Sequence, residues 1–192
     1  LVAERTVLTN QLHAEKSEAH SNKRSISRLT ERINLITRQE QDIKSEIAEI
    51  IKQDEDLLKR IELLTSIPGI GKLTAVIILA ETNGFELIRN KKQLVSYAGL
   101  DVKEKTSGIS VKGKPRISKR GNRHIRKAMH LPSLAAIRTD GWFTAIFERL
   151  VSKHGIKMKA AVAIQRKLLE LTYVLWNNNT YYNPDFGILT NV

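Results

Sequence analysis

The sequence has 192 residues, a length that suits one compact domain with an extension or two small domains. It carries 32 Lys and Arg against 20 Asp and Glu, and this formal net charge of +12 points to a polyanionic partner, nucleic acid before an anionic membrane. The absence of cysteine excludes disulfides, thiolate metal sites and cysteine nucleophiles.

Neither a membrane span nor a targeting signal is evident. No apolar run is long enough to span a bilayer, and the first ten residues lack the basic start and apolar stretch of a signal peptide. We therefore expect a cytoplasmic protein with no membrane partner. The chain begins at Leu1 instead of a methionine, which suggests a fragment of a longer protein.

Residues 1–65 are predicted to be helical, because they are rich in helix formers and contain neither Gly nor Pro. Around Ser21 and Asn22 the pattern weakens, either at a turn or at a weak part of one helix. From residue 26 the apolar residues fall into heptads, interrupted at Glu40 and Asp54. One core position holds Ile26, Ile33, Ile47 and Ile61, and the other holds Leu29, Ile36, Ile43, Ile50, Leu57 and Leu64. The length of the pattern favours a coiled coil, within or between chains, over an amphipathic helix packed on its own chain.

A compact, mostly α-helical domain is predicted over residues 66–184, followed by an irregular tail over 185–192. Apolar periodicity and Gly, Pro and Asn punctuation predict helices over 73–81, 93–100, 122–137, 142–152 and 157–176. Pro132 should kink the third of these helices. Strand signals are few, and only a short hairpin around 111–114 is expected. The fold class is therefore mostly α: a long coiled-coil helix, then a helical domain with a basic loop.

Residues 103–127 form a strongly basic segment. It holds one acid, Glu104, and ten cations, for a formal charge of +9; the cations are Lys103, Lys105, Lys112, Lys114, Arg116, Lys119, Arg120, Arg123, Arg126 and Lys127. Lys and Arg bind phosphate oxygens and release counterions from nucleic acid. The alternative is a solvated surface without a ligand, but this density favours contact with the nucleic-acid backbone, without indicating which bases are read.

A second candidate phosphate contact is the turn Ile67-Pro-Gly-Ile-Gly-Lys. Gly69 and Gly71 precede a helix whose first backbone N–H groups would be free to bind a phosphate, and Lys72 adds a charge. The turn resembles the hairpin of helix-hairpin-helix proteins, which hold the DNA backbone. It is not a Walker loop, because the spacing is wrong and no strand precedes it. The plainer interpretation is a tight turn between two helices.

Small polar residues lie inside the basic segment, among them Ser107, Ser110 and Ser118. A serine on a glycine-flanked loop among cations can attack a phosphorus atom if a base removes its proton. His124 and His130 are candidate bases, although neither is required by position. Composition alone favours serines that donate hydrogen bonds to phosphate or fill a loop.

No metal site is predicted in this chain. The carboxylates after residue 65 are scattered, and the five histidines show no ligand spacing. We therefore expect neither a bound catalytic metal nor another cofactor here.

Three motifs together resemble a known family. SIPGIGKLTAVIILAE, QLVSYAGL and RISKRGNRHIRKAMHLPSLAAIR are similar to the C-terminal domain of bacterial insertion-sequence transposases of the "one-ten" family, the Piv-type or bridge-RNA-guided serine recombinases. The resemblance covers roughly residues 65–184. The coiled coil before the motifs matches the layout of that family.

The resemblance implies a role in DNA transposition. Such proteins carry an N-terminal RNase H/RuvC-like domain whose DEDD carboxylates bind Mg²⁺, and that domain is absent here. The family's nucleophilic serine falls on Ser107, with Ser118 as the second choice. The resemblance also implies DNA or guide-RNA contacts at Lys112, Lys114, Arg116, Lys119, Arg120, Asn122, Arg123 and Arg126, and a homo-oligomer formed through the coiled coil.

Two main functions follow from these observations. The first is the coiled-coil and C-terminal part of a transposase that binds DNA and guide RNA and supplies Ser107 for strand transfer, a fragment inactive without its metal domain. The second is a non-catalytic dimeric module that clamps nucleic acid. A coiled-coil protein with a basic part that binds anionic lipid is a third alternative.

Overall fold

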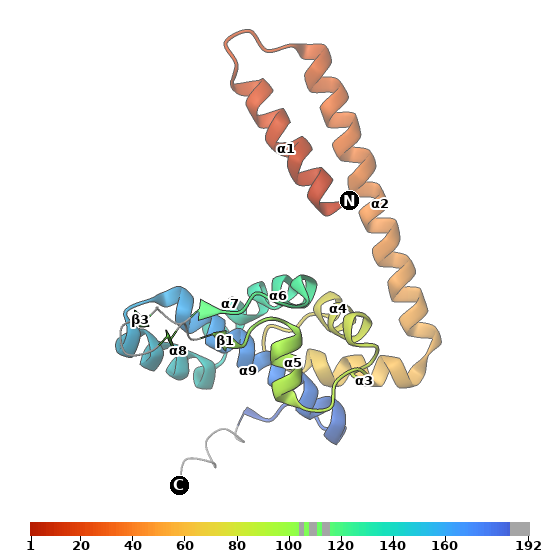
Figure 1. The fold of residues 1–192 in the computed structure, drawn as a ribbon. Coiled ribbons are helices and arrows are strands. Elements are labelled where there is room, and N and C mark those ends of the chain that lie inside the picture. The colour runs from red at the N-terminus through yellow and green to blue at the C-terminus, as the bar shows by residue number, and fades with distance from the viewer. Residues whose placement is uncertain (104–105, 108–110, 113–115, 185–192) are drawn as a thin grey trace. The chain divides into compact units, whose positions relative to one another are not determined.

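A computed structural model describes residues 1–103, 106–107, 111–112 and 116–184. Over these residues the chain is mostly α-helical, with strands of two residues each, so the predicted fold class is confirmed (Figure 1). None of the described helices has both the length and the apolar character needed to cross a membrane. The chain divides after Leu58 into an N-terminal and a C-terminal unit, whereas the sequence pattern placed the boundary after residue 65.

The N-terminal unit is a pair of helices, α1 (Val2–Ser17) and α2 (Lys23–Gln53), which lie side by side in Figure 1. Asn22 begins α2, because its side-chain oxygen accepts hydrogen bonds from the backbone N–H groups of Arg24 at 3.0 Å and Ser25 at 3.3 Å. The turn interpretation of this polar stretch is therefore correct. The helical pairing that the heptads predict occurs, at least in part, within one chain.

A polar residue of the heptad series has a partner in this pair. Leu8 of α1 and Ile36 of α2 are buried, and Glu40, one turn further along α2, is only 9% exposed. The Nε of Arg5 donates to the Oε1 of Glu40 at 2.9 Å. Glu40, which interrupts the apolar series, therefore forms an ion pair between the two helices. This ion pair fixes the register of α1 along α2.

The Arg5–Glu40 pair makes a pH-dependent contribution to stability. The hydrogen bond from Arg5 is the main reason that the pKa of the Glu40 carboxyl lies below its ordinary value. A lowered pKa stabilises the fold above the pKa of the unfolded chain, and this stabilisation is lost as pH falls through the folded pKa. We expect Glu40→Gln to unfold at a lower temperature than the wild type near neutral pH, and the two melting temperatures to converge in acid. A difference that stays constant during acidification would contradict this role.

The heptad series does not form one continuous helix. α2 ends at Gln53, and Asp54 adopts an extended conformation, its carboxylate accepting a hydrogen bond from the backbone N–H of Leu57 at 3.0 Å. α3 (Glu55–Thr65) begins there. The prediction that the coiled coil continues to residue 64 is wrong, because Ile61 and Leu64 are buried in the core of the C-terminal unit.

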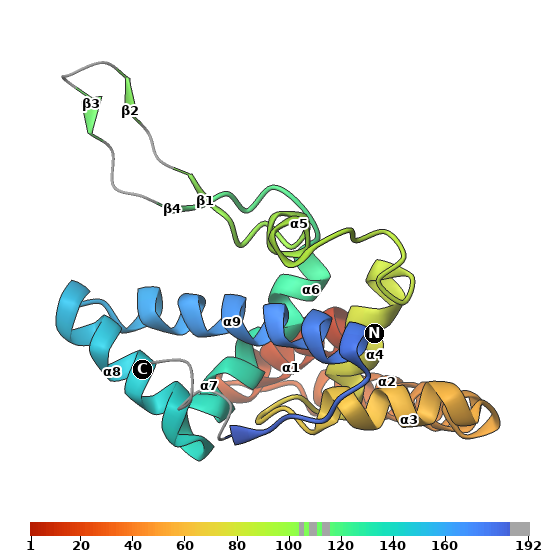
Figure 2. The same ribbon diagram turned by 90° about the horizontal axis from the view of Figure 1, so that it is seen from below.

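The C-terminal unit is arranged around its longest helix. Its helices after α3 are α4 (Lys72–Thr82), α5 (Lys91–Tyr97), α6 (Arg123–Ala128), α7 (His130–Thr139), α8 (Gly141–His154) and α9 (Lys157–Asn178). α9 contacts α5, α7 and α8, as Figure 2 shows, and buries an apolar face that includes Ile164, Leu168 and Leu169. The helix predicted over 122–137 is divided after Ala128, and Pro132 lies in the first turn of α7, where a missing N–H is tolerated.

Four short strands lie between α5 and α6. β1 (Val102–Lys103) pairs antiparallel with β4 (Arg116–Ile117), and β2 (Thr106–Ser107) pairs antiparallel with β3 (Val111–Lys112). A hairpin therefore exists in this region, but its position differs from the prediction around 111–114, because Val111 and Lys112 form the second strand of a pair whose first strand is Thr106–Ser107.

The residues after α9 return to the helical body. The backbone N–H of Tyr182 donates to Ser66 Oγ at 2.9 Å, and its hydroxyl donates to Asp140 Oδ2 at 2.9 Å. The other carboxylate oxygen of Asp140 accepts from the first backbone N–H groups of α8. Burial and the neighbouring carboxylate raise the pKa of Tyr182. The predicted tail over 185–192 lies outside the described residues.

Candidate nucleic-acid interface

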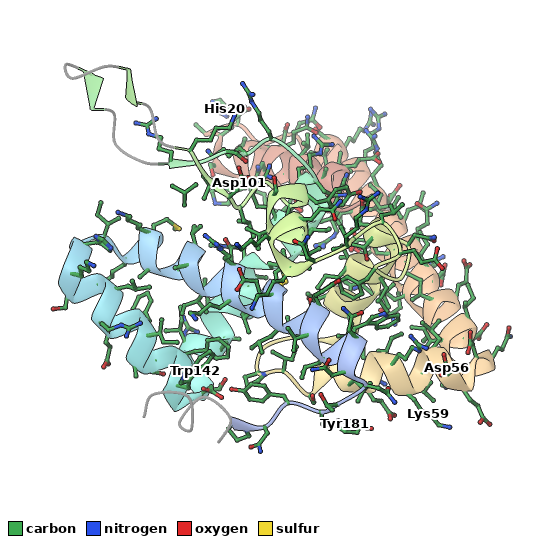
Figure 3. The ribbon with its side chains drawn as sticks, turned by 60° about the horizontal axis from the view of Figure 1, so that its bottom comes forward. His20, Asp56, Lys59, Asp101, Trp142 and Tyr181 are labelled. Atoms are coloured by element: carbon green, nitrogen blue, oxygen red, sulfur yellow. The ribbon has the colours of Figure 1, made fainter. Side chains whose placement is uncertain are left out.

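The turn from Ser118 to Asn122 joins β4 to α6 and is held against the chain that leaves α5. The backbone N–H of Ser118 donates to the carbonyl of Asp101 at 2.8 Å, and that of Lys119 donates to Gly99 at 3.0 Å. Asp101 is labelled in Figure 3, near the point where the ribbon passes from α5 toward the strands. These bonds tie together the predicted motifs YAGL and RISKRGN, which are separated in the sequence, and they define the base of the strand pair β1–β4.

Gly121 is the tightest point of this turn. Its φ is +131°, and a Cβ added there would lie 2.3 Å from the carbonyl oxygen of Tyr97. Only glycine fits this conformation and this approach of two backbones. The direction in which the basic turn leads into α6 therefore depends on a residue without a side chain.

Asn122, predicted to contact nucleic acid, has internal partners. Its side-chain oxygen accepts from the backbone N–H groups of His124 at 2.8 Å and Ile125 at 3.0 Å, which begins α6. Its amide nitrogen donates to the carboxylate of Glu81, at the end of α4. The structure therefore shows Asn122 as the residue that positions α6 relative to α4.

Ser118, the second candidate nucleophile, also has internal partners. Its hydroxyl donates to the Asp101 carboxylate and accepts from the backbone N–H of Arg120 at 3.3 Å. The side chain is half-buried. These bonds account for Ser118 as a residue that shapes the turn.

Five cations around the turn are exposed to solvent and could contact a ligand. Arg116, Lys119, Arg120 and Arg123 are exposed, and so is Lys127. No ion pair is recorded for these five within the part of the chain that the structure describes, where the recorded pairs involve other cations. These five cations are therefore not neutralised by described carboxylates, and their charge can meet an external polyanion.

Arg126 is the exception among the cations predicted to contact nucleic acid. It is half-buried, and its guanidinium donates to the carbonyl of Ala98 at 2.7 Å. One of its nitrogens is thereby used to hold the end of α5 against α6.

Part of the cationic set lines a groove of about 450 Å³. The lining residues are Ile117, Lys119, Arg123, Arg126, Lys127, His130, Leu131 and Gln165. The groove thus brings together three predicted contacts from the turn and α6 with side chains from α7 and α9. The sequence analysis did not predict two of the lining residues, Leu131 and Gln165, because it selected charged residues. Leu131 is apolar, and Gln165 lies within the apolar pattern of a long helix.

The residues of the predicted glycine turn do not line this groove. Gly69 has a φ of +84°, and a Cβ there would lie 2.4 Å from the carbonyl oxygen of Pro132, so this glycine permits close packing on α7. Gly71 begins α4 without a side-chain cap, and Lys72 is exposed. Glu81, the partner of Asn122, lies nine residues after Lys72, which is about 13 to 14 Å along the axis of α4.

The structure places Ser107 and Lys112 by their backbones alone, on β2 and β3. Ser107 pairs with Val111, and Lys112 pairs with Thr106. Lys114 lies outside the described residues. The described ranges contain no group of three His, Asp or Glu side chains that could hold a metal ion.

Known proteins show a consistent similarity to this chain. Residues 61–148 match the family model described as "Transposase IS116/IS110/IS902 family". The chain is 33% identical over 137 residues to the "Pilin gene-inverting protein" of Moraxella bovis, an alignment that covers 70% of this chain and 42% of that protein. It is also 28% identical over 120 residues to the "Insertion element IS110 uncharacterized 43.6 kDa protein" of Streptomyces coelicolor, covering 62% and 29%.

A third relative extends the match. The chain is 28% identical over 151 residues to the "Transposase for insertion sequence element IS1111A" of Coxiella burnetii, covering 73% of this chain and 38% of that protein. In each case the aligned part is less than half of the relative's own length. The family expected from the three motifs is confirmed: the chain belongs to the IS116/IS110/IS902 family of transposases, through the helical region that contains the basic turn.

Proposed function

We propose that this chain is the part of a DNA transposase that binds DNA, together with a guide RNA, and that supplies Ser107 for strand transfer during insertion-sequence transposition. The observation that carries the proposal is the set of exposed cations around the turn 118–122, which have no recorded ion-pair partner among the described residues. Such a surface binds phosphates and releases their counterions. The family membership makes DNA the expected polyanion.

Ser107 lies on β2, in the pair β2–β3, which in the sequence lies between the two strands of the pair β1–β4 next to this turn. Its hydroxyl would attack a DNA phosphorus, so that a phosphoserine ester forms, the P–O bond to the leaving deoxyribose oxygen breaks, and the serine proton ends on that oxygen. Nearby Lys and Arg would stabilise the anionic transition state. The described residues present no set of ligands for Mg²⁺. In this proposal another domain of the full protein would bind the Mg²⁺.

Self-association is a separate part of the proposal. Ile43 and Ile50 of the heptad series are 44% and 62% exposed on α2, beyond the position at which Glu40 meets α1. A second copy of the chain would cover them by coiled-coil packing. Sedimentation of the chain at several concentrations should therefore show a dimer or a larger assembly, and Ile43→Glu should shift it toward the monomer.

The test of catalysis uses the full-length protein with its donor and target DNA. Ser107→Ala should abolish strand transfer and the covalent protein–DNA adduct while DNA binding persists, because the substitution removes one oxygen atom and no charge. Ser96→Ala, at an exposed serine on α5, is the matched control and should retain full activity.

The same experiment tests the alternative, a non-catalytic module that clamps nucleic acid. Strand transfer by Ser107→Ala at the wild-type level would contradict the assignment of this serine. Loss of strand transfer and of the covalent adduct in Ser118→Ala but not in Ser107→Ala, with DNA binding and melting temperature unchanged, would transfer the role to Ser118. Full activity in both variants, with DNA binding intact, would support the binding module.

A further inference from the structure

The groove of about 450 Å³ differs in character from the exposed cations beside it. Lys119, Arg123 and Lys127 bring positive charge to it, while Ile117 and Leu131 supply apolar surface. Arg123 and Lys127 are four residues apart on α6, and therefore lie on the same face of that helix. A phosphate gains nothing from the apolar part, whereas the face of a nucleobase does, so the groove combines the two chemistries of a whole nucleotide.

Leu131 is the more exposed of the two apolar side chains, Ile117 and Leu131, in the groove. It is 73% exposed, the most exposed of the large apolar side chains of the described residues, although it lies in the first turn of a helix with a packed face. His130, beside it, is half-buried and also lines the groove. An imidazole ring and a guanidinium plane are the kinds of side chain on which unstacked bases rest.

Gln165 gives the groove a polar group that lacks a full set of partners. It is only 4% exposed, and its amide nitrogen donates to the Arg126 carbonyl at the long distance of 3.5 Å. No donor to its amide oxygen is recorded among the described residues, and Gln165 is one of the residues that line the groove. Its amide is therefore placed to pair with a base that enters the groove.

The depth of Gln165 decides which form of nucleic acid can reach it. Glutamine recognises a base by pairing its amide with the donor and acceptor groups of the base edge. A side chain that is almost completely buried cannot extend into the groove of a duplex, so the base has to leave its stack and enter the protein. Resting on the proposed nucleic-acid function, we propose that this groove binds an unpaired nucleotide of a single-stranded DNA or RNA segment, with the base against Leu131 and Gln165 and the phosphates on Lys119, Arg123 and Lys127.

The test compares single-stranded and duplex probes on the complete 192-residue chain. An oligonucleotide of about 15 residues, with a central 2-aminopurine, is used alone and annealed to its complement, and as DNA and as RNA. Leu131→Ala and Gln165→Leu should each weaken binding of the single strand by about fivefold or more, and change binding of the duplex by less than about twofold. The wild type should raise 2-aminopurine fluorescence in the single strand as the base unstacks.

Leu87→Ala is the matched control, because Leu87 is 57% exposed in the same unit and does not line the groove. It should bind both probes like the wild type. Leu131→Ala removes an exposed side chain and therefore keeps the test valid if Gln165→Leu unfolds, which thermal melting will reveal. The DNA and RNA arms identify which strand the groove prefers.

Two results would overturn the inference and leave the proposed function intact: equal weakening of single-stranded and duplex binding, or unchanged binding of both. Failure of the wild-type chain to retain any probe at low ionic strength would overturn both proposals. Selective loss with the single strand supports the unpaired nucleotide.

Discussion

Gly121→Ala is expected to lower the free energy of unfolding of the C-terminal unit by about 3 kcal/mol. The new Cβ would lie 2.3 Å from the carbonyl oxygen of Tyr97, and the backbone φ of +131° is unfavourable for any residue with a side chain. Relief of the clash requires the turn to move away from α5, which breaks the 2.6 Å hydrogen bond from the Asn122 N–H to Tyr97. The variant should therefore lose both stability and the position of the basic turn.

Thermal melting followed by circular dichroism measures this effect, and a loss of about 3 kcal/mol should appear as a decrease of about 10 °C in melting temperature. Gly141→Ala is the control, because Gly141 begins α8 and a Cβ added there would meet nothing within 4 Å. A similar melting temperature for Gly121→Ala and the wild type would show that the turn does not depend on this close approach.

Simultaneous replacement of Lys119, Arg120 and Arg123 by alanine should reduce the salt dependence of DNA binding. Each cation that contacts a phosphate contributes about one unit to the slope of log affinity against log salt concentration, so the slope should fall by about 2 to 3. All three side chains are exposed and carry no recorded ion pair in the described part of the chain, so the fold should tolerate their removal. Affinity should fall to a similar extent for unrelated duplex sequences, because backbone contacts carry no sequence information.

The matched control removes the same charge elsewhere in the unit. Lys153, Lys157 and Lys159 are exposed around the junction of α8 and α9, and none of them lines the groove. Their replacement by alanine should change the slope by less than one unit. Equal slopes for the two triple variants would mean that DNA meets the net charge of the protein and not the turn, which would contradict the interface described above.

Local sequence pattern predicted most of the secondary structure. Asn83 and Asn179 follow α4 and α9 in the left-handed conformation, and Asn22 and Asp140 accept hydrogen bonds at the starts of α2 and α8, as expected for residues that end or begin helices. The heptads predicted a helical pair, and the three motifs predicted the family. The helix ends depend on residues near each other in the chain, whose effects act over a few turns of backbone, and the heptads and motifs are likewise legible without knowledge of the tertiary contacts.

The sequence could not show which heptad residues share one helix. The heptad spacing predicts that Asp54 is a polar residue inside a continuous coiled coil. In the structure its carboxylate instead caps the start of a new helix, α3. Ile61 and Leu64 keep the heptad spacing and yet pack into the other unit. Apolar periodicity identifies a buried face without identifying what buries it.

The sequence by itself determined the net charge of +12, the helical elements and their ends, the family, and the basic segment that carries Ser107. The tertiary structure decided which of those side chains are free. Asn122 and Ser118 belong to the same motif as Arg120 and Arg123, but the first two make internal hydrogen bonds and the arginines face solvent. Only folding brings Gln165 within reach of Arg126, since that contact joins residues 39 positions apart and depends on how α9 packs, which no local pattern contains.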